Sequence, residues 1–424
     1  MVLFMKSLSY AITVCIFAIS QATHAAETAQ SLSIDAIAAD VIASNPERRF
    51  LANQITSAEA GAAAAGRLAD PELTVEFGEK RSSDIVSGAR LGDGPAYSVS
   101  IVQPIEFGGR IALRRAIAEG QVELARIGLR QFDATLSGRA RAIAYALFAA
   151  SEKADAAHVV ASRLRSLEHV LVSRDPSGPA PALEAAVLEG GAITAEARAA
   201  TAQGEFNALL YELNGLRGVP YASKIRITRP SAALPSLPSA DVLAAQANAQ
   251  NFELQSLRTQ LAQQGLSVRL ARKSRFGTVA VGPYYSREQT NVVDRSVGVR
   301  VTMPLPIWNR QAGDVAAAQG RQAQADAALV AAERRIDRLV YQQASIYQAR
   351  VEALGRWSGD TASRFERAAN EADRNYRLGA VPLATYVEMQ RQYLDAQTAI
   401  LDARRDAVDA AAQLRALTGG SDRP

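Results

Sequence analysis

Between Pro306 and Pro382 the sequence contains no proline, and this stretch constrains the fold more than any other. Its apolar residues recur mostly every seven positions, as in a coiled-coil seam: Leu329, Ile336, Val340, Tyr347 and Leu354. A single helix from Ile307 to Leu378 would be about 100 Å long. Because a compact core has no room for such a rod, we predict an elongated helical molecule.

Apolar residues alternate with polar or small ones directly before this stretch and in two earlier places, which is typical of strands with one apolar face. Pro104 and Pro304 end two of these strands. We expect two strand pairs, joined by polar loops at 78–96 and 285–295. Their shared apolar face comprises Leu73, Val75, Phe77, Val99, Ile101, Val297, Val299 and Val301.

Breaks in the first half of the sequence recur about 200 positions later. Asn45-Pro46-Glu47 has its counterpart at Asn251-Phe252-Glu253, and Gly178 has its counterpart at Gly379. A steady offset of this kind indicates an internal duplication rather than chance similarity between alanine-rich halves. We predict a first structural repeat at 26–220, an extended linker at 221–238, a second repeat at 239–420 and a short tail at 421–424.

The N-terminus has the pattern of a secretory signal peptide. Lys6 precedes an apolar run from Leu8 to Ile19, and Thr23-His24-Ala25 supplies small residues for cleavage after Ala25. A retained membrane anchor is the weaker alternative, because the run is shorter than the ~20 residues that a spanning helix needs. The only cysteine, Cys15, lies inside this run, so the mature chain is expected to contain no disulfide.

Four strands cannot close a barrel, and open strand edges are not tolerated in hydrocarbon. Three copies of the chain would supply twelve strands, within the range of outer-membrane barrels. The fold class that we predict is therefore mainly α with a small membrane β-barrel: a trimeric twelve-stranded outer-membrane barrel, continued below the membrane by a long α-helical coiled-coil barrel. The apolar strand residues would face lipid, and the alternating polar residues would line a channel.

Several motifs resemble those of the outer membrane efflux protein (TolC) family. They are Tyr376-x-x-Gly379, Val387-x-x-Gln390 and the ending Leu417-Thr418-Gly419. Short motifs, including 70–73 (DPEL), 106–110 (EFGGR) and the stretch from Pro304 to Gly313, are similar to the branch that serves heavy-metal (cobalt, zinc, cadmium, nickel, copper) resistance pumps.

The resemblance implies a homotrimeric duct in the outer membrane of a Gram-negative bacterium, working with a periplasmic membrane-fusion adaptor and an inner-membrane proton-driven RND pump. It also implies that the turns after the long helices form the periplasmic tip. The candidate adaptor contacts there are Gly178, Gly379, Val381, Pro382 and Leu383.

Two acidic positions that ring the pore in drug-efflux relatives correspond here to Thr385 and Glu388. Thr385 is not acidic, and Glu184, its counterpart in the first repeat, is a candidate replacement. One hypothesis is that Glu388 and Glu184 form an acidic gate that selects cations. The alternative is that both are solvated glutamates near helix starts.

No residue set indicates catalysis, a cofactor or a resident metal. The sequence lacks the nucleophile-elbow, P-loop and zinc-protease motifs. His158 and His169 would lie about 16 Å apart on one helix, too far to share a metal. The net charge of +4 is too diffuse to indicate nucleic acid.

The leading hypothesis is therefore a passive outer-membrane conduit of a tripartite exporter for divalent metal cations. A conduit for drugs or for a type I secreted polypeptide is the alternative within transport. A periplasmic coiled-coil adaptor without membrane strands is the alternative from another class of protein.

Overall fold

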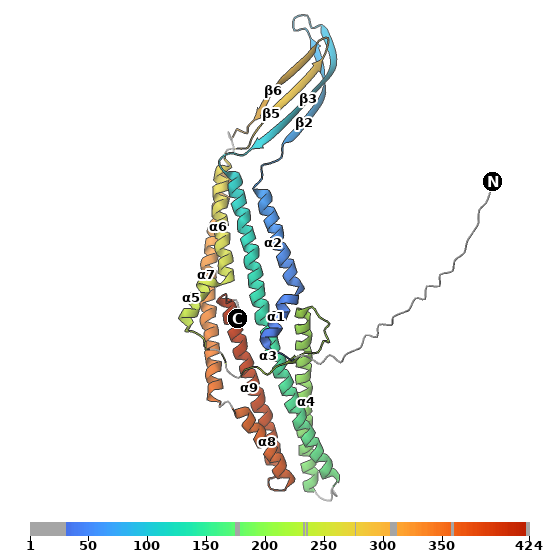
Figure 1. Ribbon diagram of the computed structural model, residues 1–424, viewed down its shortest axis with the longest axis vertical. Helices are drawn as coiled ribbons and strands as arrows, with labels where there is room; N and C mark the ends of the chain where they lie inside the picture. Colours follow the sequence, from blue (N-terminus) through green and yellow to red (C-terminus); the bar gives the residue numbers. More distant parts are fainter. Residues whose placement is uncertain are drawn as a thin grey trace, which may run out of the picture.

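The computed structural model describes residues 31–173, 179–231, 234, 236–275, 277–305, 312–357 and 360–420. The predicted signal peptide, residues 1–25, and the predicted tip residue Gly178 lie outside these ranges. The described part is a long helical bundle with a β-sheet at one end and the α3–α4 and α8–α9 hairpins at the other (Figure 1).

The elements of the first half are β1 (Ser31–Leu32), α1 (Ile34–Ser44), α2 (Pro46–Ala65), β2 (Glu72–Ser83), β3 (Arg90–Ile105), α3 (Arg110–Ser173) and α4 (Pro179–Arg217). Those of the second half are β4 (Arg226–Ile227), α5 (Ala240–Gln250), α6 (Phe252–Lys273), β5 (Val279–Gln289), β6 (Val293–Thr302), α7 (Ala312–Arg356), α8 (Thr361–Arg377) and α9 (Leu383–Leu417). The 64 residues of α3 make a helix of about 96 Å, which runs most of the length of the bundle.

Strands β2, β3, β5 and β6 form one antiparallel sheet in that order. The predicted loops at 78–96 and 285–295 are wrong, because pairing continues through both segments, for example between Lys80 and Gly94. Lys80 also contacts Glu288 at 2.5 Å, so polar side chains stabilise the outer part of the sheet where we expected loops. Only short turns at 84–89 and 290–292 remain.

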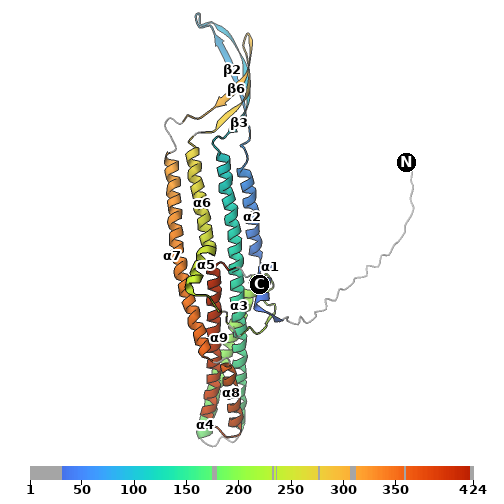
Figure 2. The same ribbon diagram turned by 60° about the vertical axis from the view of Figure 1, so that its left-hand side comes forward.

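The prediction of one helix from Ile307 to Leu378 is also wrong. Residues 307–311 lie outside the described part, α7 ends at Arg356 and α8 begins at Thr361. The backbone N–H of Arg364 donates to the carbonyl of Asp360, which marks a new helix start. Figure 2 shows α8 beside α9 at the end of the bundle remote from the sheet.

Three of the five residues of the predicted seven-residue seam lie in a buried core, and Leu329 and Leu354 are partly buried against it. Ile336, Val340 and Tyr347 of α7 are buried against α5 and α9. Two further buried clusters follow along the bundle, one around α1 and the middle of α3 and one between the ends of α3, α4, α8 and α9. Alanines are frequent in all three clusters, and their small side chains let the helix axes approach closely.

The same helix joint occurs in both halves. Asn45 Nδ2 donates to the carbonyl of Leu216 at 2.9 Å, and Asn251 Nδ2 donates to that of Leu417 at 2.8 Å. The Oδ1 atom of each asparagine also caps the helix that follows it. A buried asparagine therefore fastens the end of one helix to the start of another in each half.

Strands β1 and β4 pair in parallel beside the bundle. We expected residues 221–238 to be an extended linker, so this short pairing was missed. Two residues on each side carry little sequence signal.

Candidate functional site

One face of the sheet is apolar and exposed. Cross-strand pairing places Leu73 beside Ile101 and Val75 beside Val99. The three valines of β6 share this face, because Val297 and Val301 pair with Tyr285 and Val281 of β5. All eight residues of the predicted apolar face therefore lie together, and Phe77 and Val297 are 84% and 80% exposed. Contiguous apolar surface of this kind marks a site for lipid or protein contact.

The opposite face of the sheet is polar and linked across the strands. Arg300 lies over the ring of Tyr284, 5.6 Å from its centroid, and donates to Ser100 Oγ at 3.2 Å. Ser98 donates to Glu76 at 2.8 Å on the same face. The sheet is thus two-sided, with one apolar face suited to contact with lipid and one polar face suited to contact with water.

Both edges of the sheet are open within the described residues. Strand β2 pairs only with β3, and β6 pairs only with β5. Each edge therefore presents backbone N–H and C=O groups that need a partner, above all if the sheet meets hydrocarbon.

None of the helices in the described ranges contains a stretch that is long and apolar enough to cross a membrane.

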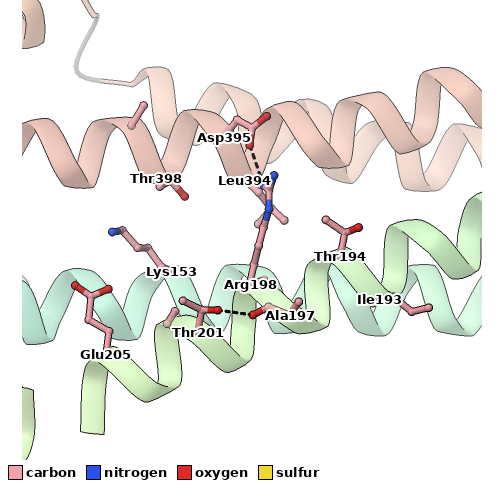
Figure 3. Close-up of a pocket in the computed structure, with 13 residues that line it drawn as sticks. Lys153, Ile193, Thr194, Ala197, Arg198, Thr201, Glu205, Leu394, Asp395 and Thr398 are labelled. Carbon is pink, nitrogen blue, oxygen red and sulfur yellow. Dashed lines mark hydrogen bonds and ion pairs between the residues drawn. The ribbon is translucent and has the colours of Figure 1, made fainter. Parts of the chain in front are cut away.

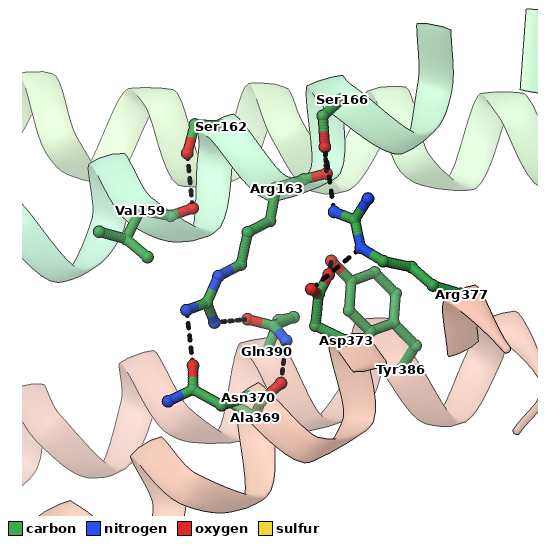
Figure 4. Close-up of polar contacts among 10 residues, drawn as sticks. All are labelled: Val159, Ser162, Arg163, Ser166, Ala369, Asn370, Asp373, Arg377, Tyr386 and Gln390. Carbon is green, nitrogen blue, oxygen red and sulfur yellow. Dashed lines mark hydrogen bonds and ion pairs between the residues drawn. The ribbon is translucent and has the colours of Figure 1, made fainter. Parts of the chain in front are cut away.

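At the other end of the bundle, polar contacts join α3 to α8 and α9 (Figure 4). Arg163 Nη2 donates to Asn370 Oδ1 at 2.5 Å, and its Nη1 donates to Gln390 Oε1 at 3.5 Å. Gln390 is only 1% exposed, and its Nε2 donates to the carbonyl of Ala369 at 2.8 Å. One arginine of α3 thus contacts both helices of the second hairpin.

A second set of contacts lies nearer the turn. Arg377 joins Asp373 at 3.0 Å and donates to Ser166 Oγ of α3 at 3.3 Å. The Tyr386 hydroxyl donates to Asp373 at 3.2 Å, and burial followed by the nearby Asp373 carboxylate raises the pKa of Tyr386. We call the polar residues of the two sets the tip network: Arg163, Ser166, Asn370, Asp373, Arg377, Tyr386 and Gln390.

The predicted gate residues are exposed on two helices, Glu184 on α4 and both Thr385 and Glu388 on α9. Glu388 is not a bare carboxylate. It contacts Arg391 at 2.7 Å and accepts from Gln392 at 2.6 Å, and these contacts lower its pKa to about 2. Arg391 follows Glu388 by three positions, so helix spacing could have revealed the pair.

The predicted adaptor contacts differ in exposure. Gly379 has a φ of 73° and ends α8, which is a conformation that glycine adopts without strain. It is exposed, as is Pro382, whereas Val381 is half-buried. Leu383 is only 8% exposed and packs in the core, so it supports the turn from below.

A groove of about 790 Å³ lies between α3, α4 and α9 (Figure 3). Arg198 of α4 bridges it to Asp395 of α9 at 2.8 Å, and Lys153 of α3 contacts Asp402 at 2.6 Å. Its walls also include the threonines Thr194, Thr201 and Thr398. These ion pairs join the two hairpins along the groove.

Within the described part of the chain, no group of three His, Cys, Asp or Glu residues is placed to hold a metal ion. His158 and His169 are both exposed on α3.

Comparison with known proteins shows a partial match to one family model and a shared fold with solved structures. The family model for the outer membrane efflux protein matches residues 243–420. No curated protein matches by sequence.

Solved structures resemble nearly the whole chain, and three of them are described here. A membrane protein from Pseudomonas aeruginosa has a TM-score of 0.74 and 16% identity, with 92% of this chain and 91% of that one covered. The outer-membrane channel OprN has a TM-score of 0.72 and 16% identity, with 92% of this chain and 90% of OprN covered. CusC, described in connection with transmembrane channel formation, has a TM-score of 0.71 and 13% identity, with 93% of both chains covered. The chain therefore has the fold of these proteins, and its second half matches the outer membrane efflux protein family.

Proposed function

We propose that the chain is the outer-membrane duct of a tripartite efflux system and that it works as a homotrimer. The observation that carries this proposal is the two-sided sheet. Its exposed apolar face, polar opposite face and two open edges fit a segment of a barrel wall in a membrane. The helical bundle extends about 100 Å away from the sheet, far enough to reach deep into the periplasm.

The number of strands supports three copies. Four strands leave two edges open, whereas β6 of one copy beside β2 of the next continues the antiparallel order and closes a ring of twelve. The channel structures that share the fold, and the family that matches residues 243–420, support the same assignment.

The helical tip is the proposed docking end for a periplasmic adaptor and, through it, an inner-membrane RND pump. Exposed turn residues such as Gly379 and Pro382 are available for contact. The tip network would hold the hairpins together until the adaptor binds. A passive conduit of this kind performs no covalent chemistry, so its energy must come from the pump.

We further propose divalent heavy-metal cations as the cargo. Support comes from the short motifs that resemble those of the heavy-metal branch of the family. One of them spans Glu106 to Arg110, where Glu106 contacts Arg114 beneath the sheet, so this motif shapes the joint between sheet and helix. Organic drugs or a secreted polypeptide are the competing cargoes.

A deletion strain tests the cargo. We expect the strain to become sensitive to at least one of nickel, cobalt, zinc, cadmium or copper, and a plasmid copy of the gene to restore resistance. Sensitivity to antibiotics alone would overturn the metal proposal and favour drug export.

Conductance in planar bilayers tests the duct itself. A periplasmic adaptor would fractionate away from the outer membrane and would not conduct, and that result would overturn the proposed function.

A further inference from the structure

Two arginines face each other across β5 and β6 near the turn end of the sheet. Arg287 and Arg295 are direct partners in the strand register, so their side chains lie on the same face. Tyr97 pairs with both Arg287 and Phe77, which makes this the apolar face. Like charges directly opposite each other destabilise a sheet unless another group compensates them.

No described carboxylate lies within salt-bridge distance of either arginine. The neighbouring carboxylates already have cations: Glu79 has Arg81, Asp93 has Arg90, and Glu288 and Asp294 share Lys80 on the opposite face. The Glu79 of an adjoining copy at β6 would be engaged in the same way. The sheet itself therefore leaves the two positive charges uncompensated.

These arginines lie near the turn-side boundary of the apolar face: beyond them, the paired part of β5 and β6 carries only Gln289 and Val293 on this face. The strand from Val279 to Arg287 covers ~26 Å, close to the height of the apolar band of outer-membrane barrels before strand tilt is considered. Tyr97 and Tyr285, with ring centroids 6.4 Å apart, lie at the same boundary. Arg287 Nη1 donates to the Tyr97 hydroxyl at 3.5 Å. Tyrosines at the end of an apolar band mark the level of lipid headgroups.

We propose that Arg287 and Arg295 bind the phosphate groups of a phosphorylated lipid in the outer leaflet, a site that rests on the proposed function. A guanidinium group matches phosphate geometry through paired hydrogen bonds, and two of them side by side suit two phosphates or one doubly charged phosphate. The acyl chains of the same lipid would cover the apolar face below, including Val297 and Val299. Headgroup charge and acyl chains thus fit the two parts of the surface in one molecule.

Native mass spectrometry of the full-length protein in mild detergent tests the site. The probes are bisphosphorylated lipid A, dephosphorylated lipid A with the same acyl chains, and inorganic phosphate. We expect the bisphosphorylated lipid to bind at least about tenfold tighter than the dephosphorylated one. Because the contact is electrostatic, added sodium chloride should weaken it.

The variant Arg287→Gln/Arg295→Gln should lose this preference. Arg300→Gln is the matched control, because it removes the same kind of charge from the opposite face of the same sheet. It should bind the lipid as the wild type does. Equal binding by the double variant and the wild type would overturn the proposal, as would equal binding of the two lipids. Arginine-dependent binding of inorganic phosphate without preference for the lipid would show a free-phosphate site instead.

Conductance separates this inference from the proposed function. In phosphatidylcholine bilayers the double variant should still conduct, since the polar face is unchanged. If the wild type conducts but lipid binding does not depend on the two arginines, only the lipid site is refuted. If the wild type neither trimerises nor conducts, the proposed function is refuted.

Discussion

The substitution Arg163→Met should loosen the second helical hairpin from α3 at the tip. Methionine keeps the length and helix preference of the side chain but removes the donors to Asn370 and Gln390. A hydrogen bond from a charged donor contributes ~1.5–3 kcal/mol, so we expect a loss of about 2 kcal/mol in the closure of the hairpin on α3. That corresponds to roughly 30-fold faster hydrogen exchange for amides that exchange only when the hairpin opens.

Hydrogen–deuterium exchange followed by mass spectrometry measures this effect peptide by peptide. Amides of α8 and the start of α9 should exchange faster in Arg163→Met, whereas those of α4 should not change. Arg165→Met is the matched control, because Arg165 lies two residues away and contacts Glu196 of α4 at 2.9 Å. It should loosen α4 and spare α8. Unchanged protection of α8 in Arg163→Met, or the same pattern in both variants, would refute the reasoning.

Three further predictions concern the gate, the sheet and the helix joint. Arg391→Gln removes the main cause of the low pKa of Glu388, which should return toward its usual value. Reversal potentials of the variant should then show a stronger preference for cations at pH 7, which fades by pH 4 as the Glu388 carboxylate is protonated. In the wild type this carboxylate stays charged down to about pH 2. Identical pH profiles of the two proteins would refute the acidic gate. Val299→Lys places a charge on the apolar face and should destabilise the membrane-inserted protein by ~2–4 kcal/mol, which lowers the yield of assembled protein in outer-membrane fractions. Thr302→Lys, on the polar face, should assemble normally. In Gly419→Ala the added Cβ would clash with the carbonyl of Gln250, the last residue of α5, and alanine would be strained at the φ of 66° that Gly419 adopts. Thermal unfolding followed by circular dichroism should therefore show destabilisation of at least ~2 kcal/mol. An unchanged unfolding midpoint would contradict this.

Local periodicity predicted most of the architecture. The alternation of Val297, Val299 and Val301 set which face of the sheet is apolar, because side chains on a strand change face at every residue. The seven-residue spacing of Val340 and Tyr347 identified the buried seam of α7. Both features depend only on neighbours in sequence, so one sequence was enough to find them.

Element ends were less predictable. The segment from Trp357 to Asp360 contains a serine and a glycine that favour turns, but the absence of proline led us to extend the helix through it. The strands continue beyond their apolar parts because pairs such as Lys80 and Glu288 stabilise them, and alternation of apolar residues does not report such pairs.

The tip network lay beyond sequence reasoning for a different reason. Arg163 and Gln390 are 227 positions apart, and their contact exists only because α3 and α9 run side by side. Nothing local distinguishes Arg163 from the many other arginines of α3. By contrast, the Glu388–Arg391 pair has ordinary helix spacing and could have been predicted.

The protein mass of the complex in mild detergent, measured by light scattering with the detergent contribution subtracted, tests the central claim most directly. Four strands with two open edges require other copies to complete the wall, so we predict a mass equal to three chains. A single-chain mass in protein that retains its helical content would contradict the shared barrel and the duct built on it.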